Sequence, residues 1–329
     1  MVELLTAQAG TQQQQQDVGA TRARVLVVLA FFCTYVIWGS TYLAVHYAVE
    51  TIPPLFVAGL RHLFAGGLLF AWCWRRGLRP DRRQWYASMV LGVLFFLIGH
   101  GTLHWAIQTM PSGLAAVLVA TEPVWIAVML AATRKARITP ALVAGLVLGL
   151  VGVALLIETD MQAGRGALLS SAVVLVGTFS WAAGMLYSRR ASLHPDAIMS
   201  AAMSLLTGAA LLLLAGTLAG EANGLSLAHV SLRSLLGLAY LAVFGSLVTY
   251  SAYFWLLQRC PPALVATHTY VNPIVALLLG WAVAGEMISS RIVFSAAAVV
   301  AAVALVSMGS RVVNATAVRR PGSMAPDQP

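Results

Sequence analysis

Apolar stretches of about twenty residues, separated by short polar segments, follow one another along almost the whole chain. About twenty apolar residues is the length that a helix needs to cross the hydrocarbon core of a bilayer. The stretches lack the alternation of apolar and polar residues that a transmembrane strand would need. The pattern therefore predicts an all-α integral membrane protein with ten transmembrane helices. They are expected at residues 25–46, 53–74, 86–106, 110–132, 138–157, 166–187, 197–219, 233–257, 262–284 and 292–310.

The polar segments set the orientation of the predicted helices. With the N-terminus in the cytoplasm, sixteen of the twenty Lys and Arg residues fall on the cytoplasmic side and three on the other side. Such an excess marks cytoplasmic loops, and it requires an even number of crossings. Both termini are therefore expected in the cytoplasm, as disordered polar tails at residues 1–24 and 311–329. The first tail contains a run of glutamines and lacks the early apolar core of a signal peptide.

Composition supports the membrane assignment and narrows the chemistry. Hydrophobic residues make up 60% of the 329 residues and charged residues 9%, against about 25% charged in soluble domains. The net charge of +9 lies in the short gaps between apolar stretches, so we expect no nucleic-acid partner. The three cysteines are isolated, and no G-x-x-x-x-G-K-[ST] motif occurs. We therefore expect no metal site, no cofactor and no direct use of ATP.

The two halves of the chain repeat each other. Each half holds five predicted helices, an odd number, so the second half crosses the membrane in the opposite sense. We expect two inverted five-helix repeats, at residues 25–158 and 164–310, with a substrate site near the bilayer midplane where they meet. At a shift of 150 residues, the matched pairs are Trp105 with Trp255, Gln108 with Gln258, Pro111 with Pro261, and Pro123 with Pro273.

Four short motifs carry a family resemblance. They are Trp38-Gly39-Ser40-Thr41-Tyr42, Leu60-Arg61-His62-Leu63, Glu122-Pro123-Val124, and Tyr270-Val271-Asn272-Pro273 with Gly285-Glu286 after it. Their order and spacing resemble the drug/metabolite transporter superfamily, EamA type, a family of ten-helix inner-membrane transporters. The resemblance implies transport of a small metabolite, such as an amino acid or a related amphipathic compound, commonly by export. It also implies that helices 1–4 and 6–9 surround the cavity and that helices 5 and 10 are peripheral.

One position departs from the family pattern. The family often carries Gly-Glu after its fourth helix, but the residue that pairs with Glu286 at the shift of 150 is Ala136, within a basic loop. A role for an acid at that place in the first half is therefore not expected. Glu286 itself is expected to be an interfacial charge at the outer end of its helix.

Two charged residues fall deep within predicted helices and are the first candidates for a substrate and proton pathway. A charge at the bilayer centre costs about 2.5–3.5 kcal/mol on insertion scales and is expected to face a cavity. Because a buried carboxyl group favours its protonated form, Glu122 is the best candidate for proton coupling. The alternative for Glu122 is a structural pair with Arg61 or a histidine. Arg61 matches a recurrent arginine of the family, so a structural or gating role stands beside a pathway role.

Glu122 pairs with Asn272 at the shift of 150, and each of the two residues precedes a proline. Pro123 and Pro273 lack the amide proton that would bond the carbonyl group four residues earlier. Helix breaks are expected at both prolines. Water, a cationic substrate or a neighbouring hydroxyl group could bond the freed carbonyl oxygens. Asn272 is therefore grouped with Glu122 as a pathway residue.

Histidine and aromatic residues complete the predicted pathway. His100 and His104 are four residues apart and so share one face of a helix. Without a third ligand, a cavity wall is favoured over a metal site, and a proton relay is the alternative. His62 and His268 are expected in packing positions. The aromatic candidates are Trp38, Tyr270, Trp105 and Trp255.

Three functions stay open on these grounds, and a secondary transporter working by alternating access is favoured. A membrane-embedded enzyme would need clustered acids, whereas the eleven acids of this chain are scattered. A sensor would normally add a soluble signalling domain. Gly145 and Gly149 form a small-xxx-small motif, which suits either packing within the chain or a homodimer. The expected partners are a small-molecule substrate and the lipid bilayer.

Overall fold

The computed structural model describes residues 24–133, 140–161, 165–260, 265 and 267–318, and every regular element in these ranges is a helix. The first half contains η1 (Cys33–Ile37), α2 (Trp38–Ala48), α3 (Pro54–Arg75), α4 (Arg82–Leu91), η2 (Gly92–His100), α5 (Gly101–Ala106), α6 (Ser112–Val119), α7 (Glu122–Ala132) and α8 (Pro140–Met161). The second half contains α9 (Arg165–Ser188), α10 (Ala197–Leu218), α11 (Glu221–Gly224), η3 (Leu227–His229), α12 (Leu232–Tyr240), η4 (Leu241–Val248), α13 (Thr249–Arg259), α15 (His268–Ala284) and α16 (Ser290–Val318).

The described residues contain seven helices that are long and apolar enough to cross a membrane. Each coincides with a predicted stretch within a few residues. The three remaining predicted stretches, at 138–157, 262–284 and 292–310, fall on helices α8, α15 and α16. The all-helical class is confirmed, whereas ten crossings and the sidedness of the termini stay predictions. The predicted tails, 1–24 and 311–329, fall almost wholly outside the residues whose side chains are described. The seven helices are Arg24–Ala48, Pro54–Arg75, Arg82–Ala106, Ser112–Ala132, Leu168–Ser188, Ala197–Leu218 and Leu232–Arg259.

Three of the long helices change winding along their length, which the apolar pattern did not predict. The π-helical turns η1, η2 and η4 interrupt helices that are otherwise α-helical. A π-helical turn adds a residue to the turn and commonly occurs at functional sites. Residues 92–98 of η2 and 242–248 of η4 are related by the same shift of 150 residues that aligns the two halves.

The two prolines behave differently from each other. Near Pro123 the helix is interrupted, since α6 ends at Val119 and α7 begins at Glu122. Pro123 is then in the first turn of α7, where a missing amide proton costs nothing. Pro273 instead lies inside the uninterrupted helix α15, so the helix break expected there is wrong. Close packing of α15 against α2 holds the helix across this position.

Glycines allow the helices around the centre to approach closely. A Cβ atom on Gly39 of α2 would lie 2.6 Å from Cβ of Val275, and one on Gly113 of α6 would lie 2.5 Å from Cδ2 of Leu277. Real Cβ contacts essentially never fall below 3.0 Å. Both neighbours belong to α15, so α2 and α6 pack on this helix through glycine. This packing brings the segments that carry Glu122 and Asn272 to the same place.

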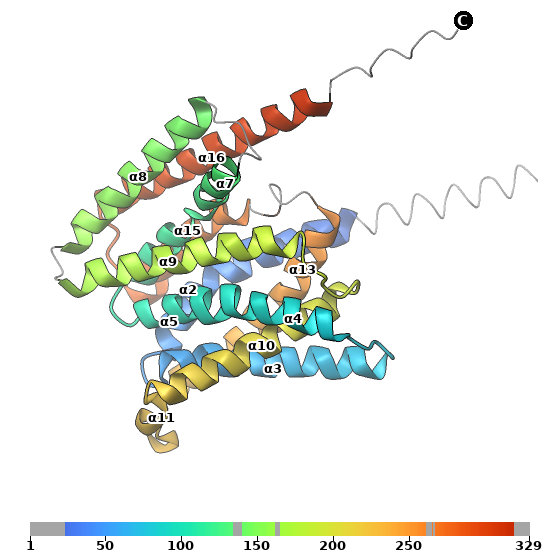
Figure 1. Ribbon diagram of the computed structural model, residues 1–329. Helices are drawn as coiled ribbons and strands as arrows, with labels where there is room; N and C mark the ends of the chain where they lie inside the picture. The colour runs from blue at the N-terminus through green and yellow to red at the C-terminus, as the bar shows by residue number, and fades with distance from the viewer. Residues whose placement is uncertain (1–23, 134–139, 162–164, 261–264, 266, 319–329) are drawn as a thin grey trace, which may run out of the picture.

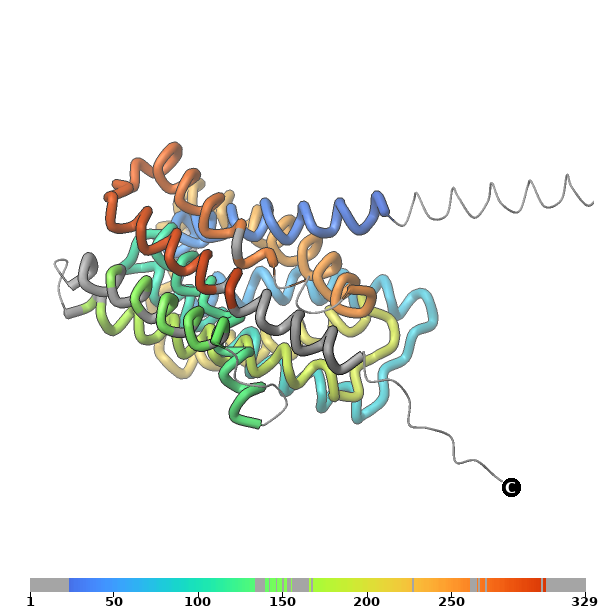
Figure 2. The backbone as a smooth tube through the Cα atoms, turned by 90° about the horizontal axis from the view of Figure 1, so that it is seen from above, coloured from blue at the N-terminus to red at the C-terminus, as the bar shows by residue number. Residues whose placement is uncertain are grey.

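Helices α8 and α16 pack side by side at one edge of the bundle, away from α3 and α10 (Figure 1). The view from above also places them next to each other (Figure 2). Their place agrees with the expectation that the fifth and tenth helices are peripheral. Gly149 of α8 faces Ala302 of α16, where an added Cβ would meet the alanine Cβ at 3.4 Å. Gly149 thus has a packing partner within the chain, and a homodimer stays a prediction.

Candidate functional site: a polar cavity between the two halves

A cavity of about 70 Å³ lies among α2, α6, α9 and α15, with walls from both halves of the chain. Small-molecule sites usually measure about 300–1,000 Å³. The cavity would therefore have to widen before it could admit a metabolite. Its lining includes Trp38, Thr41, Tyr42, Arg61, His100, Glu122, Thr178, Trp181, His268 and Asn272.

Glu122 lies on this lining at the first position of α7, directly after the interruption of the helix. Its side chain is 1% exposed, and its Oε1 atom has no hydrogen-bond partner among the described residues. No ion pair joins Glu122 to Arg61, which was one of the structural alternatives for this residue. A buried carboxyl oxygen without a partner is costly. It is the clearest feature of the site that a bound ligand or proton would satisfy.

Arg61 begins a chain of hydrogen bonds that crosses between the two halves. Its Nε donates to Oγ of Ser246 at 2.9 Å, and this hydroxyl lies 3.2 Å from Nδ1 of His62. Nε2 of His62 is 3.0 Å from Nδ1 of His100, whose Nε2 is 3.0 Å from the hydroxyl of Tyr250. The chain fixes Arg61, which is 2% exposed, at the edge of the cavity. His62 is therefore a member of a polar network, although the sequence suggested only a packing position.

His100 and Tyr250 are themselves related by the shift of 150 residues, so equivalent positions of the two halves meet in a hydrogen bond. His104 lies one turn beyond His100 and is fully buried. Its Nδ1 bonds the carbonyl oxygen of His100 at 2.7 Å, while its Nε2 has no partner among the described residues. His104 is absent from the cavity lining. The two histidines share a helix face, as expected, but only His100 reaches the cavity.

Asn272 lines the cavity and also holds the winding of the first helix. When its amide group is oriented to satisfy its neighbours, its nitrogen lies 3.0 Å from the carbonyl oxygen of Thr34 and 2.9 Å from that of Tyr35. Both carbonyl groups belong to the π-helical turn η1. Asn272 thereby connects α15 to the first helix of the other half, beside its contribution to the cavity.

Aromatic rings form the remaining wall. The ring of Trp38 lies 5.2 Å from that of Tyr250, 5.1 Å from that of His268 and 6.2 Å from that of Trp181. Its Nε1 donates to the carbonyl oxygen of Gly245 at 3.2 Å, which fixes the indole. Such rings can pack against an apolar solute and can stabilise a cation over their faces.

Two tryptophans proposed for the pathway lie elsewhere. Trp105 is 39% exposed on the outside of the bundle. It follows His104 directly, and one residue is about 100° of helix rotation, so it points away from the histidine face. Trp255 is half-buried beneath the guanidinium of Arg259, whose Cζ lies 4.4 Å from the ring centre. Neither lines the cavity. The side chain of Tyr270 lies outside the described residues.

The cavity is also lined by residues that the sequence analysis did not assign to the pathway. Tyr42 and Thr41 follow Trp38 on one face of α2. Val174, Gly177, Thr178 and Trp181 recur at helical spacing on α9, and all four line the cavity. This stripe mixes small, polar and aromatic residues at positions i, i+3, i+4 and i+7. This mixed composition was the sequence signal that could have identified α9 as a cavity helix, because a helix face turned to lipid would be uniformly apolar.

The sequence was compared with known protein families and proteins. The model of the EamA-like transporter family matches residues 25–158 and 168–308. An uncharacterized inner membrane transporter of Escherichia coli K12, YedA, is 37% identical over 288 residues, covering 85% of this chain and 90% of that protein. A probable amino-acid metabolite efflux pump of the same strain is 26% identical over 253 residues, covering 74% and 81%.

A solved crystal structure of another protein shares the fold. It superposes with a TM-score of 0.62 at 19% sequence identity, and covers 87% of this chain and 98% of that chain. At this identity the likeness concerns the arrangement of helices alone.

Proposed function

The chain belongs to the EamA-like transporter family, and from this premise we propose that it carries a small zwitterionic metabolite across the inner membrane by alternating access. The multi-pass character agrees with its apolar helices, and the relative YedA is named an inner membrane transporter. The proposed direction is export, since a relative that is 26% identical is named a probable amino-acid metabolite efflux pump. The enzyme and sensor alternatives gain no support from relatives that are named as transporters.

The observation that carries the proposal is the cavity lined by both Arg61 and Glu122, which no ion pair joins. A guanidinium group can bind a carboxylate through two parallel hydrogen bonds. A carboxylate can in turn bind an ammonium group. An amino acid presents both groups, so it would compensate both charges, and its side chain would lie against Trp38 and Trp181.

Glu122 also supplies a basis for exchange with protons. A carboxyl group with an unpartnered oxygen can hold a proton when no solute is bound. When the ammonium group of a solute takes its place, the proton leaves for the side to which the cavity is open. Because the two compete for one carboxyl group, each crossing of the solute is matched by a proton crossing the other way. The network of His62, His100 and Tyr250 serves in this scheme as the wall that positions Arg61, and a proton relay is its alternative role.

Inverted repeats suit alternating access, and several features support those proposed at 25–158 and 164–310. The turns η2 and η4 occupy equivalent positions of the two halves, and so do His100 and Tyr250. One fold inserted in two orientations can give inward-open and outward-open states of similar energy. The excess of arginine in the loops on one side supports the proposal that both termini lie in the cytoplasm.

An export screen tests the proposed function. Cells that overproduce the protein are challenged with toxic amino acids and amino-acid analogues, and resistance is compared between the parent and Glu122→Ala. We expect resistance to at least one such compound, lost in the variant at equal protein level. Exchange in proteoliposomes then measures the flux directly. The proposal is wrong if no amino acid or amphipathic relative moves faster than through protein-free liposomes.

A second prediction distinguishes a tryptophan of the cavity wall, Trp181, from one outside the cavity, Trp105. Trp181→Leu removes a ring of the cavity wall and is expected to raise the KM for solute about tenfold, because an aromatic contact contributes about 0.5–1.5 kcal/mol beyond its buried area. Trp105→Leu, a matched change on the lipid-facing side of α5, is expected to leave the KM within twofold. Initial rates in proteoliposomes measure both. Equal KM values for the two variants would contradict the assigned wall.

A further inference from the structure

Helix α6 begins without a cap of its own, and a carboxylate from the other half of the chain supplies one. The residue before the helix is Pro111, which has no side-chain hydrogen bond to offer. Oε1 of Glu286 accepts from the amide of Ser112 at 3.0 Å and from its hydroxyl at 2.7 Å. Oε2 accepts from the amide of Gly113 at 3.3 Å. Glu286, which the sequence suggested is an interfacial charge at the end of its helix, is therefore bound across the two halves.

Helix α3 repeats this arrangement. It also follows a proline, Pro53, without a cap from its own segment. Oε2 of Glu221, from α11 in the second half, accepts from the amide of Leu55 at 3.0 Å. Burial raises the pKa of the Glu221 carboxyl, and hydrogen bonds from the amides of Leu55 and Phe56 oppose part of that rise. The first amides of a helix carry partial positive charge, so a carboxylate is the group they bind best.

Both contacts lie on one face of the bundle, since α3 and α6 begin where α10 and α15 end. On the opposite face, α4 and α10 are capped by acids of their own segments, Asp81 and Asp196. At the shift of 150 residues the position equivalent to Glu286 is Ala136. Earlier in each half the shift is 142 residues, which pairs Pro53 with Pro195, and there the position equivalent to Glu221 is Arg79. Although the two halves repeat each other, Glu286 and Glu221 have no acidic counterparts at the equivalent positions, which belong to the opposite face of the bundle.

We propose that Glu286 and Glu221 are latches that hold this face of the transporter closed and that must release for the cavity to open there. The proposal rests on the proposed alternating-access function and adds residues that set its conformational equilibrium. Opening this face would separate α15 from α6 and α11 from α3. It would break the hydrogen bonds of Glu286 to Ser112 and Gly113 and those of Glu221 to Leu55 and Phe56. By the orientation proposed above, the latched face is the outer one. The resting protein would then favour access from the cytoplasm, the side from which an exporter takes its solute.

Glycine makes the Glu286 latch possible. A Cβ on Gly280 would collide with Oε2 of Glu286 and would lie 2.8 Å from its Cδ. Gly280→Ala is therefore expected to displace the Glu286 carboxylate from its position at the start of α6 while its charge remains. This variant opens the latch by a route independent of substituting Glu286.

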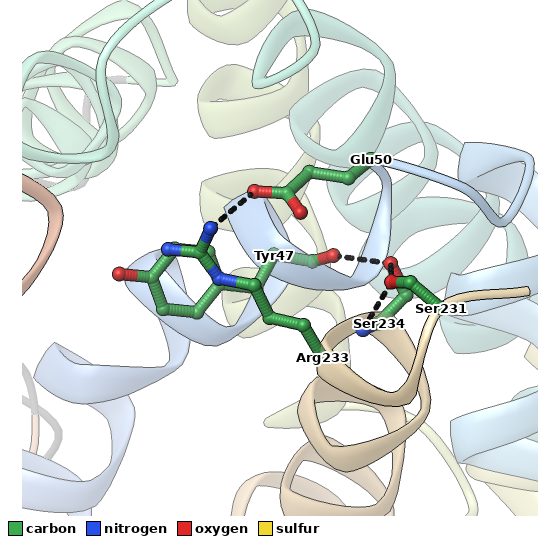
Figure 3. A network of polar contacts seen from close by, with 5 residues as sticks. All are labelled: Tyr47, Glu50, Ser231, Arg233 and Ser234. Carbon is green, nitrogen blue, oxygen red and sulfur yellow. Dashed lines mark hydrogen bonds and ion pairs between the residues drawn. The ribbon is translucent and has the colours of Figure 1, made fainter.

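The same face carries an ordinary ion pair that serves as a matched control. Nη1 of Arg233 lies 3.5 Å from Oε1 of Glu50, and Arg233 also stacks on Tyr47 (Figure 3). The hydroxyl of Ser234 donates to the carbonyl oxygen of Tyr47 at 2.7 Å beside it. The side chains of the pair are 55% and 35% exposed. An exposed pair of this kind contributes little, so Glu50→Gln removes an acid from the same face without opening it.

Labelling of a cavity cysteine tests the latches. The reporter is Thr178→Cys on α9, which lines the cavity and lies away from both latches, in full-length protein with Cys33, Cys73 and Cys260 replaced by serine. A membrane-impermeant maleimide is applied from each side of the membrane in turn. We expect Glu286→Gln, Glu221→Gln and Gly280→Ala each to raise the labelling rate from the latched face about fivefold. Glu50→Gln is expected to stay within twofold of the parent.

The outcome can be interpreted without knowing the solute. Parent-like labelling in Glu286→Gln and Gly280→Ala, with the proteins still eluting as folded species in detergent, overturns the Glu286 latch. An equal rise in the labelling rate for Glu50→Gln overturns the assignment as well, since the loss of any acidic charge on this face would then be enough to open it. Absence of solute flux in the parent speaks against the proposed function, whereas unchanged labelling with flux intact speaks against the latches alone.

Discussion

Glu122→Gln is expected to lower solute exchange roughly 10- to 150-fold, because hydrogen bonds to charged groups contribute about 1.5–3 kcal/mol. Glutamine keeps the shape of the side chain in the buried first turn of α7. It removes both the charge that would bind an ammonium group and the site that would hold a proton. The residual flux of the variant should therefore also lose its dependence on a pH gradient. Counterflow of labelled amino acid in proteoliposomes, with and without an imposed gradient, measures both effects.

The same substitution at Glu50 is the control for Glu122→Gln. Glu50 lies at the surface in an exposed ion pair, so Glu50→Gln should preserve both the flux and its pH dependence. Full gradient dependence in Glu122→Gln would assign proton coupling to another group. Full flux in that variant would remove Glu122 from the pathway altogether.

The fold was predictable from sequence to the extent that burial in lipid governs it. Helices such as α3 and α10 need some twenty apolar residues, and their bounds fell within about two residues of the prediction. The π-helical turns were not predictable, because hydropathy is insensitive to one extra residue in a turn. At η1 the turn is bound by a tertiary contact, since Asn272 bonds two of its carbonyl groups from another helix. The uninterrupted course of α15 through Pro273 likewise depends on its neighbours.

The site was predictable from sequence where the free-energy cost of burying a charge in the membrane identifies a residue. Glu122 and Arg61 are expensive to bury, and the structure places both on one cavity. Repetition alone was a poor guide to orientation, since Trp105 and Trp255 are paired in sequence and neither reaches the cavity. The caps formed by Glu286 and Glu221 could not be read from the chain, because each bonds amides more than 160 residues away.

Displacement of the Arg61 guanidinium is expected to impair recognition of the solute carboxylate. Arg61→Lys replaces a planar fork with a single ammonium group, which cannot form two parallel hydrogen bonds. We expect the KM for an amino acid to rise roughly 10- to 150-fold, since hydrogen bonds to charged groups contribute about 1.5–3 kcal/mol. The KM for the corresponding amine, which lacks the carboxylate, should change little. Initial rates in proteoliposomes at matched protein level give both values.

Gly245→Ala provides the same test without altering Arg61. A Cβ at this position would lie 2.8 Å from Nη2 of Arg61 and 2.8 Å from Cγ2 of Thr41, so the guanidinium and the Thr41 methyl group must both shift while the charge of Arg61 remains. The variant should therefore reproduce the direction of the Arg61→Lys effect, with a smaller rise in KM. Arg259→Lys, outside the cavity, is the matched control. If Arg61→Lys transports normally at unchanged protein level, Arg61 serves packing and its hydrogen bond to Ser246, and the carboxylate must be bound by another group.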